Sequence, residues 1–160
     1  MSMMIRMEFP DGVFNHRIVG VVIHDSYVLL HRNLHDDFWA LPGGRAELME
    51  SSEKTIRREF QEELAIDVNV ERLLWIVENF FDHDQTRYHE LSFYYLVNIE
   101  KQPNVLDKQR IHSGIEKDVE LVFQWFPLKE LDVLPLYPAF LRSALRQLPD
   151  GIQHIVHYDN

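Results

Sequence analysis

The chain has 160 residues, 46% of them hydrophobic, which suits a single globular domain over residues 1–160. A formal net charge of −10, with only 16 Lys and Arg, argues against binding to polymeric nucleic acid. There is no apolar run long enough to span a membrane, no signal-peptide core and no cysteine, so we expect a cytoplasmic protein without a membrane partner.

The first part of the chain predicts a β-hairpin followed by a short strand. Residues 16–24 and 26–32 are rich in β-branched residues and meet at a turn near Asp25. Residues 38–41 predict a short apolar strand, followed by a break at the Pro-Gly-Gly of residues 42–44, for which a plain tight turn is the alternative. Glycine there permits positive φ and a close approach of the backbone to a ligand.

A helix with an acidic face is predicted within residues 44–66, which read GRAELMESSEKTIRREFQEELAI. Positions i, i+3 and i+4 of a helix are surface neighbours, so Glu59, Glu62 and Glu63 would share one face. Three carboxylates at this spacing repel one another, and a positive charge must offset the repulsion.

An apolar stripe runs beside the acidic face and orients it. Ile56, Phe60 and Leu64 follow the i, i+4, i+8 spacing of a helix that packs on a sheet. Ser51 or Ser52 can cap the helix N-terminus, where Glu53 in the first turn is favoured by the helix dipole.

Arg58 and a divalent cation can supply the positive charge. Arg58 stands next to Glu59 and four residues before Glu62, so it can hold a carboxylate in one rotamer. Clustered carboxylate oxygens suit Mg²⁺ or Mn²⁺ better than zinc. The alternative for three helical glutamates alone is a solvated acidic surface.

The second part of the chain predicts strands and one more helix. Two long strands are expected over residues 68–82 and 88–99, then a polar mobile loop over 100–118, a strand over 119–126, an amphipathic helix over 140–148 and a last strand over 152–158. This order predicts a mixed sheet flanked by helices, an α/β fold.

The pattern G-x5-E-x7-R-E-U-x-E-E, where U is a bulky apolar residue, is formed by Gly44, Glu50, Arg58, Glu59, Phe60, Glu62 and Glu63. It resembles the signature of the Nudix hydrolases, a MutT-like family. The resemblance implies an α/β/α sandwich with a central mixed sheet over about residues 14–150. It also implies metal binding by the three glutamates with the Gly43 carbonyl, orientation of these carboxylates by Arg58, and a role for Glu50 in holding loop and helix together.

One position departs from the family pattern. Ala65 stands where a glycine usually ends the motif, ahead of Ile66. If the helix ends with positive φ there, alanine costs about 1 kcal/mol relative to glycine. No ligand or charge is lost, so the departure concerns the helix end and not the activity.

A general base and phosphate-binding residues are expected outside the motif. Glu90, Glu116 and Glu120 are the candidates for the base, and Glu116 in the predicted loop could reach water when substrate is bound. Arg32, Arg45, Arg87 and Arg110 could contact phosphate oxygens; Arg32, at the end of a predicted strand near the motif, is the best placed, and Arg45 within the motif is the second candidate for substrate. A solvated surface position is the alternative for each of these residues.

Histidines and aromatic residues give weaker signals. His83 and His89 match no common zinc spacing. The aromatic runs at residues 80–81 and 93–95 could stack a nucleobase, although alternating strand positions more often fill a core.

The expected function is Mg²⁺- or Mn²⁺-dependent hydrolysis of a phosphoanhydride bond in a nucleoside diphosphate linked to a group X. The substrate is a small nucleotide, either of the nucleotide-sugar or ADP-ribose type or a nucleoside triphosphate. A non-hydrolytic nucleotide sensor on the same fold is the alternative, and a homodimer is possible in this family. A second alternative is an isopentenyl diphosphate isomerase, which shares the fold and has an essential cysteine. This chain has no cysteine, which argues against that function.

Overall fold

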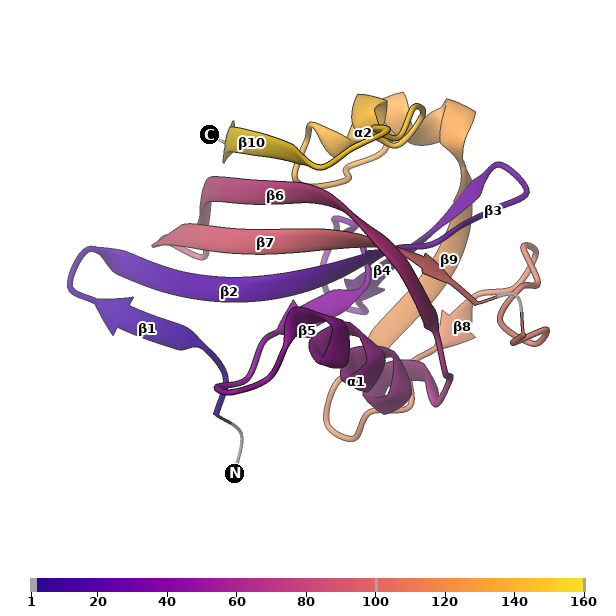
Figure 1. Cartoon of the computed structure of the whole chain (residues 1–160), viewed down its shortest axis with the longest axis horizontal. Helices are drawn as coiled ribbons and strands as arrows, with labels where there is room; N and C mark the ends of the chain where they lie inside the picture. Colours follow the sequence, from indigo (N-terminus) through magenta and orange to yellow (C-terminus); the bar gives the residue numbers. More distant parts are fainter. Residues whose placement is uncertain (1–2, 100, 160) are drawn as a thin grey trace.

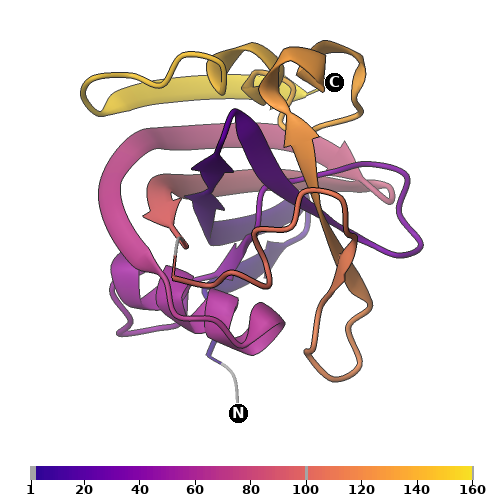
Figure 2. The same ribbon diagram turned by 90° about the vertical axis from the view of Figure 1, so that its right-hand side faces the viewer.

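The computed structural model describes residues 3–99 and 101–159, whose strands form two sheets (Figure 1, Figure 2). The larger sheet has the strand order β1-β2-β7-β6-β10, with β5 beside β2. Its strands are β1 Arg6–Phe9, β2 Gly12–Val21, β5 Gly43–Arg45, β6 Asn69–His83, β7 Thr86–Asn98 and β10 Gln153–Asp159. The smaller sheet, in the order β3-β4-β9-β8, contains β3 Ile23–His24, β4 Tyr27–Asn33, β9 Leu121–Pro127 and β8 His112–Ser113.

The larger sheet is mixed, because β2 pairs with β7 and β6 pairs with β10 in parallel while its other pairs are antiparallel. Helix α1 (Ser52–Leu64) lies on one side of the strands, and the 3₁₀ helix η1 (Leu128–Val133) with helix α2 (Leu141–Ala144) lies on the other (Figure 1, Figure 2). The predicted α/β fold with a central mixed sheet and flanking helices is confirmed.

Two hydrophobic cores form because successive strand residues face opposite sides. Ile18 of β2 and Leu29 of β4 belong to the core that contains the α1 residues Ile56 and Phe60. Val19 of β2, by contrast, belongs to the core beneath η1 and α2. A polar side chain in line with Val19 therefore lies on the sheet face opposite to α1.

The predicted hairpin at Asp25 exists, and the two predicted long strands form a second one; each turns on two residues. Asp25 and Ser26 have φ values of 51° and 67°, as tight turns between strands of natural twist require. Asp84 and Gln85, with φ values of 48° and 64°, join β6 to β7 in the same way. The first hairpin is smaller than predicted, because only β3 pairs with β4 and the long strand β2 belongs to the other sheet.

The Pro-Gly-Gly segment does not form the tight turn that is the alternative for it. Gly43 and Gly44 begin strand β5 and pair with Val19 and Ile18, and neither has positive φ. Glycine is needed at position 43 because a Cβ atom would overlap the backbone carbonyl oxygen of Ile18. The close backbone approach is therefore real, but the neighbour is strand β2. The strand predicted over residues 38–41 reduces to isolated bridges at Trp39 and Ala40.

The C-terminal helix is shorter than predicted, since only residues 141–144 of the expected 140–148 are α-helical. Leu145 and Leu148 still pack against the core from the turns that follow, which is why the apolar spacing resembles a longer helix. Strand β8 lies within the predicted loop 100–118, whose residue Glu100 is outside the described residues, and β1 and η1 are additional elements. Among the described residues, no helix has both the length and the apolar character to cross a membrane.

Candidate active site

Helix α1 is defined at both ends by its own sequence. Ser51 is the N-cap, and its hydroxyl accepts a hydrogen bond from the Lys54 N–H at 3.4 Å. At the other end Ala65 adopts the left-handed conformation, with φ 54° and ψ 38°, and its N–H donates to the Gln61 carbonyl at 3.0 Å. The helix therefore ends with positive φ at Ala65, the conformation in which alanine is strained relative to glycine.

The apolar stripe fixes how the helix lies on the sheet. Ile56 and Phe60 are fully buried, and a Cβ atom on Gly20 would lie only 2.7 Å from the Phe60 ring. The helix thus sits directly on β2. On the neighbouring helix face, the carboxyl group of Glu59 lies over Gly44, where a Cβ atom would overlap it. The strand positions this carboxylate.

Arg58 holds three carboxylates at once. Its Nε donates to Glu50 Oε2 at 2.7 Å and its Nη2 to Glu50 Oε1 at 2.9 Å, a bidentate pair. Its Nη1 donates to Glu59 at 2.8 Å and to Glu62 at 3.2 Å. The Nη2 group also donates to the Arg45 carbonyl at 3.1 Å, which ties β5 to the helix.

Glu50 joins the loop before the helix to the helix itself. Besides Arg58, it accepts hydrogen bonds from the Thr55 hydroxyl at 2.7 Å and from the Glu47 N–H at 3.2 Å. These bonds, led by that of Arg58, lower the pKa of the Glu50 carboxyl from 4.5 to about 2. The same contact raises the pKa of Arg58 above its ordinary value.

Glu63 is the most enclosed of the three helical glutamates, with 5% exposure. Burial, followed by the negative charge of Glu59, raises the pKa of the Glu63 carboxyl to about 9. Among residues 3–99 and 101–159, no three acidic or histidine side chains are already gathered around one point as metal ligands. Glu59 and Glu62 are bonded to Arg58 instead. The donor set nonetheless fits a hard cation, because it consists of carboxylate oxygens whose mutual repulsion a cation would relieve.

The three candidate bases lie in different surroundings. Burial, followed by the negative charges of Glu59 and Glu62, raises the pKa of the Glu116 carboxyl. Glu116 therefore lies within electrostatic reach of the helix carboxylates. Its loop is attached to the helix by the Ile115 N–H, which donates to the Glu63 carbonyl at 2.8 Å. The side chain of Glu120 is 65% exposed and pairs with His35 at 3.0 Å.

Glu90 lies on the other side of the larger sheet, where it is buried. It accepts hydrogen bonds from Asn15 and Ser92 at 3.4 and 3.1 Å. Of the three candidates, therefore, Glu116 is the one whose surroundings include the acidic helix face.

The two candidate substrate arginines are placed differently. Arg45 is in β5, donates to Asn15 Oδ1 at 3.1 Å and lies beside Arg17 in the strand register. Its pKa is lowered by burial and then by the charges of Arg6 and Arg17. Arg32 donates to the carbonyls of residues 33, 34 and 36 and lies over the Trp39 ring, so its hydrogen bonds go to its own loop.

Two polar residues outside the predicted set, Arg17 and His31, are linked to Glu63 through the charge of Arg17. Arg17 lowers the pKa of Glu63 by its charge, and it donates to the Leu41 carbonyl at 3.1 Å. His31 lies 3.5 Å from Arg17, and burial followed by the Arg17 charge lowers the His31 pKa to about 3. Period-two alternation along the strand could have indicated Arg17, because it is in line with the core residues Val19 and Val21 and so faces the protein interior.

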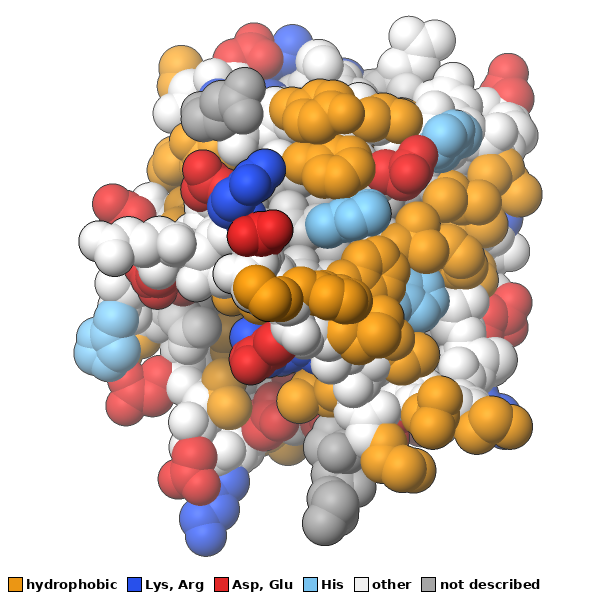
Figure 3. Space-filling model, turned by 90° about the vertical axis from the view of Figure 1, so that its left-hand side faces the viewer, with side chains coloured by type: hydrophobic (Ala, Val, Ile, Leu, Met, Phe, Trp, Pro, Cys, Tyr) orange, Lys and Arg blue, Asp and Glu red, His pale blue; other side chains and the backbone are white. Residues whose placement is uncertain are grey.

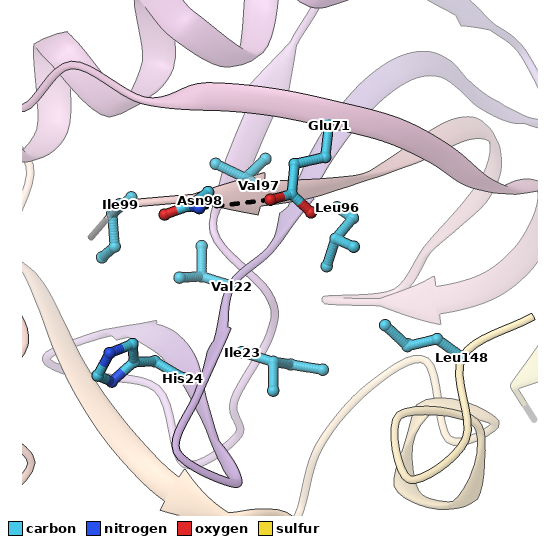
Figure 4. A pocket seen from close by; sticks show the side chains of 9 residues that line it. All are labelled: Val22, Ile23, His24, Glu71, Leu96, Val97, Asn98, Ile99 and Leu148. Atoms are coloured by element: carbon cyan, nitrogen blue, oxygen red, sulfur yellow. Dashed lines mark hydrogen bonds between the residues drawn. The ribbon is translucent and has the colours of Figure 1, made fainter. Parts of the chain in front are cut away.

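Two surface hollows lie away from the carboxylates. One of about 700 Å³ is formed by the aromatic ends of β2, β6, β7 and β10 (Figure 3). There the Phe80 ring stacks between His89 and Tyr158. The other, of about 260 Å³, is mainly apolar and contains the Asn98 to Glu71 hydrogen bond of 3.3 Å (Figure 4). No residue of the 44–66 motif lines either hollow.

Comparison with known proteins identifies the family. The NUDIX domain model matches residues 14–148. Over 71 residues the chain is 34% identical to the Bacillus subtilis (strain 168) protein named "Putative ADP-ribose pyrophosphatase YjhB", a match that spans 44% of this chain and 34% of that relative.

Solved structures share the fold. An ADP-ribose pyrophosphatase from Streptococcus suis 89-1591 is 16% identical, with a TM-score of 0.57 over 89% of this chain and 98% of its own. A MutT protein from Bacillus halodurans is 17% identical, with a TM-score of 0.60 over 90% of this chain and 89% of its own. Since the NUDIX domain model covers most of the sequence, the chain belongs to the Nudix family, as its motif predicts.

Proposed function

We propose that the chain hydrolyses a phosphoanhydride bond in a nucleoside diphosphate linked to a group X, with a divalent metal ion. The observation that carries the proposal is the acidic face of α1, where Gly44 and Arg58 hold Glu59 in place beside Glu62 and Glu63. A nucleotide sugar of the ADP-ribose type is the first substrate class to test, because the matched relative and one structural neighbour carry that name. Nucleoside triphosphates are the second.

The residues that would hold Mg²⁺ or Mn²⁺ are Glu59, Glu62 and Glu63, with the backbone carbonyl of Gly43. Such ions neutralise diphosphate oxygens, lower the pKa of a bound water and stabilise charge on the leaving phosphate. Their positive charge also explains how a protein of net charge −10 would bind an anionic nucleotide rather than a nucleic acid polymer.

The remaining steps belong to side chains of the chain itself. Arg58 keeps the carboxylates in fixed rotamers through its four carboxylate hydrogen bonds. The positive charge of Arg17 acts on Glu63, and Arg45 is paired with Arg17 in the strand register, so these two cations suit the negatively charged diphosphate. Glu116 would accept the proton of the attacking water, because it is the candidate base beside the helix carboxylates.

The test is a product assay with purified protein. ADP-ribose, nucleotide sugars, dinucleoside polyphosphates and nucleoside triphosphates are each incubated with Mg²⁺ or Mn²⁺, and products are separated by chromatography. We expect a mononucleotide together with a phosphorylated X, or with pyrophosphate from a triphosphate. Nucleotide binding without any product would instead identify a sensor, and would contradict the proposed hydrolysis.

A further inference from the structure

A row of buried polar side chains crosses the larger sheet on the face opposite to α1. Asn15 of β2 is in register with Glu90 of β7, and Glu90 is in register with Asn79 of β6. Their exposures are 3%, 9% and 4%. Buried polar groups of this kind need hydrogen-bond partners, so a partner is expected for each polar atom of the row.

Two of the three side chains are satisfied within the protein. The Glu90 carboxylate accepts hydrogen bonds from Asn15 Nδ2 at 3.4 Å and from the Ser92 hydroxyl at 3.1 Å. Asn15 Oδ1 in turn accepts from Arg45 Nε at 3.1 Å. The row therefore begins at Arg45 of β5, whose backbone carbonyl accepts a hydrogen bond from Arg58.

Asn79 is the exception. Its Oδ1 atom is buried and accepts no hydrogen bond from any residue that the structure describes, although the side chain lies between the in-register neighbours Glu90 and His157. An unpaired buried carbonyl oxygen destabilises a fold, and a leucine of similar shape would avoid that cost. The Asn79 oxygen is therefore available to accept a hydrogen bond from a donor group.

The position of Asn79 fits the nucleoside part of a substrate. Arg17, whose charge acts on Glu63, lies two strands and two residues away from Asn79 in the sheet register. Strand spacing and rise place the two backbones roughly 12 Å apart. A nucleoside attached to a diphosphate at the acidic face can reach across this interval.

We propose that Asn79, with Glu90 beside it, is a specificity-determining subsite for a hydrogen-bond donor of the nucleoside. The subsite offers an amide oxygen next to a carboxylate, which suits an N–H or O–H group. Two parts of a nucleoside carry such groups, the exocyclic amine of the base and the ribose hydroxyls. The inference rests on the proposed function for the location of the diphosphate.

Calorimetric binding of three mononucleotides tests the subsite without requiring turnover. AMP, its 6-oxo analogue IMP and 2′-deoxy-AMP are titrated into the wild type and Asn79→Leu, with Asn69→Leu as a matched control at an exposed position of the same strand. We expect the wild type to bind AMP about tenfold or more tightly than one analogue, because a site built to bond a donor rejects a ligand that lacks it. IMP as the weaker ligand identifies the base amine, and deoxy-AMP the ribose hydroxyl.

In Asn79→Leu the preference should disappear while the melting temperature stays equal or rises, and Asn69→Leu should keep the preference. Equal binding of all three nucleotides by the wild type would overturn the subsite. So would an unchanged preference in Asn79→Leu, or a uniform loss of binding together with a lower melting temperature, which is the mark of a structural role. Wild-type hydrolysis of ADP-ribose is measured separately, so failure of the proposed function is distinguishable from failure of the subsite.

Discussion

Gly44 lies directly beneath the carboxyl group of Glu59, so that any side chain at position 44 would overlap that carboxyl. The backbone of Gly44 is in an extended strand without positive φ. The glycine of the motif therefore serves to make room for a carboxylate, and not to form a turn.

Replacing Gly44 by alanine should push the Glu59 carboxylate out of place and weaken Mg²⁺ activation. Because changes in the support of a metal ligand commonly cost about 10- to 100-fold in metal affinity or activity, we expect a loss of that size. Gly151→Ala is the matched control, since a Cβ atom there meets nothing within 4 Å. The measurement is the Mg²⁺ dependence of hydrolysis; equal dependence in both variants would contradict the role of Gly44.

Arg58→Lys should destabilise the protein and reduce its sensitivity to acid. Lysine keeps the charge but cannot form the bidentate pair with Glu50, so we expect a loss of about 1 to 3 kcal/mol in the free energy of unfolding. Arg57→Lys is the control, because Arg57 is about half exposed and its contact to Glu53 is 3.7 Å long.

The pH dependence of the same variant follows from Glu50. Its pKa is lowered from 4.5 to about 2, so the folded form holds this proton less tightly than the unfolded chain does. The resulting stabilisation is present above pH 4.5 and is lost as the pH falls toward 2. Urea unfolding across this range should show a smaller loss in Arg58→Lys than in the wild type, and an identical loss would contradict the account.

Ala65→Gly should stabilise the protein without changing its activity. Alanine in the left-handed conformation costs about 1 kcal/mol, and relief of that cost raises the melting temperature by about 2 to 4 °C in a domain of this size. Ala144→Gly, in the right-handed helix α2, should have the opposite sign. The melting temperatures of both variants are measured by circular dichroism. A lower melting temperature for Ala65→Gly than for the wild type would show that the cap is not strained.

Glu116→Gln should reduce the rate of hydrolysis, with little effect on stability. Loss of a general base costs typically about 10²- to 10⁴-fold in rate. Glu120→Gln is the matched control, because Glu120 is exposed and paired with His35. If kcat falls for Glu120→Gln and not for Glu116→Gln, the assignment of the base to Glu116 is wrong.

Sequence patterns predict those parts of the site that lie on one continuous element. The face formed by Glu59, Glu62 and Glu63 and the stripe formed by Ile56 and Phe60 follow from helix geometry alone, and α1 has both. The aromatic run 93–95 fills the core as its alternation allows, with Tyr94 and Tyr95 at 2% and 8% exposure.

Residues that meet through strand pairing could not be placed in the same way. The side chains of Asn15 and Glu90 are neighbours because β2 and β7 pair in parallel, although 75 positions separate them in the sequence. Alternation shows that each faces the same side as core residues, but it does not show which strands are adjacent. For the same reason, Gly43 indicates a close backbone neighbour without identifying it as Ile18.

The central claim is that the acidic face of α1 carries the chemistry, and Glu63→Gln tests it most directly. The matched control is Glu53→Gln, at an exposed position in the first turn of the same helix. Product release from ADP-ribose and from nucleoside triphosphates with Mg²⁺ is compared for both variants and the wild type, with circular dichroism to verify the fold. We predict that Glu63→Gln folds but releases no product while Glu53→Gln keeps wild-type turnover; unimpaired Mg²⁺-dependent hydrolysis by Glu63→Gln would contradict the account.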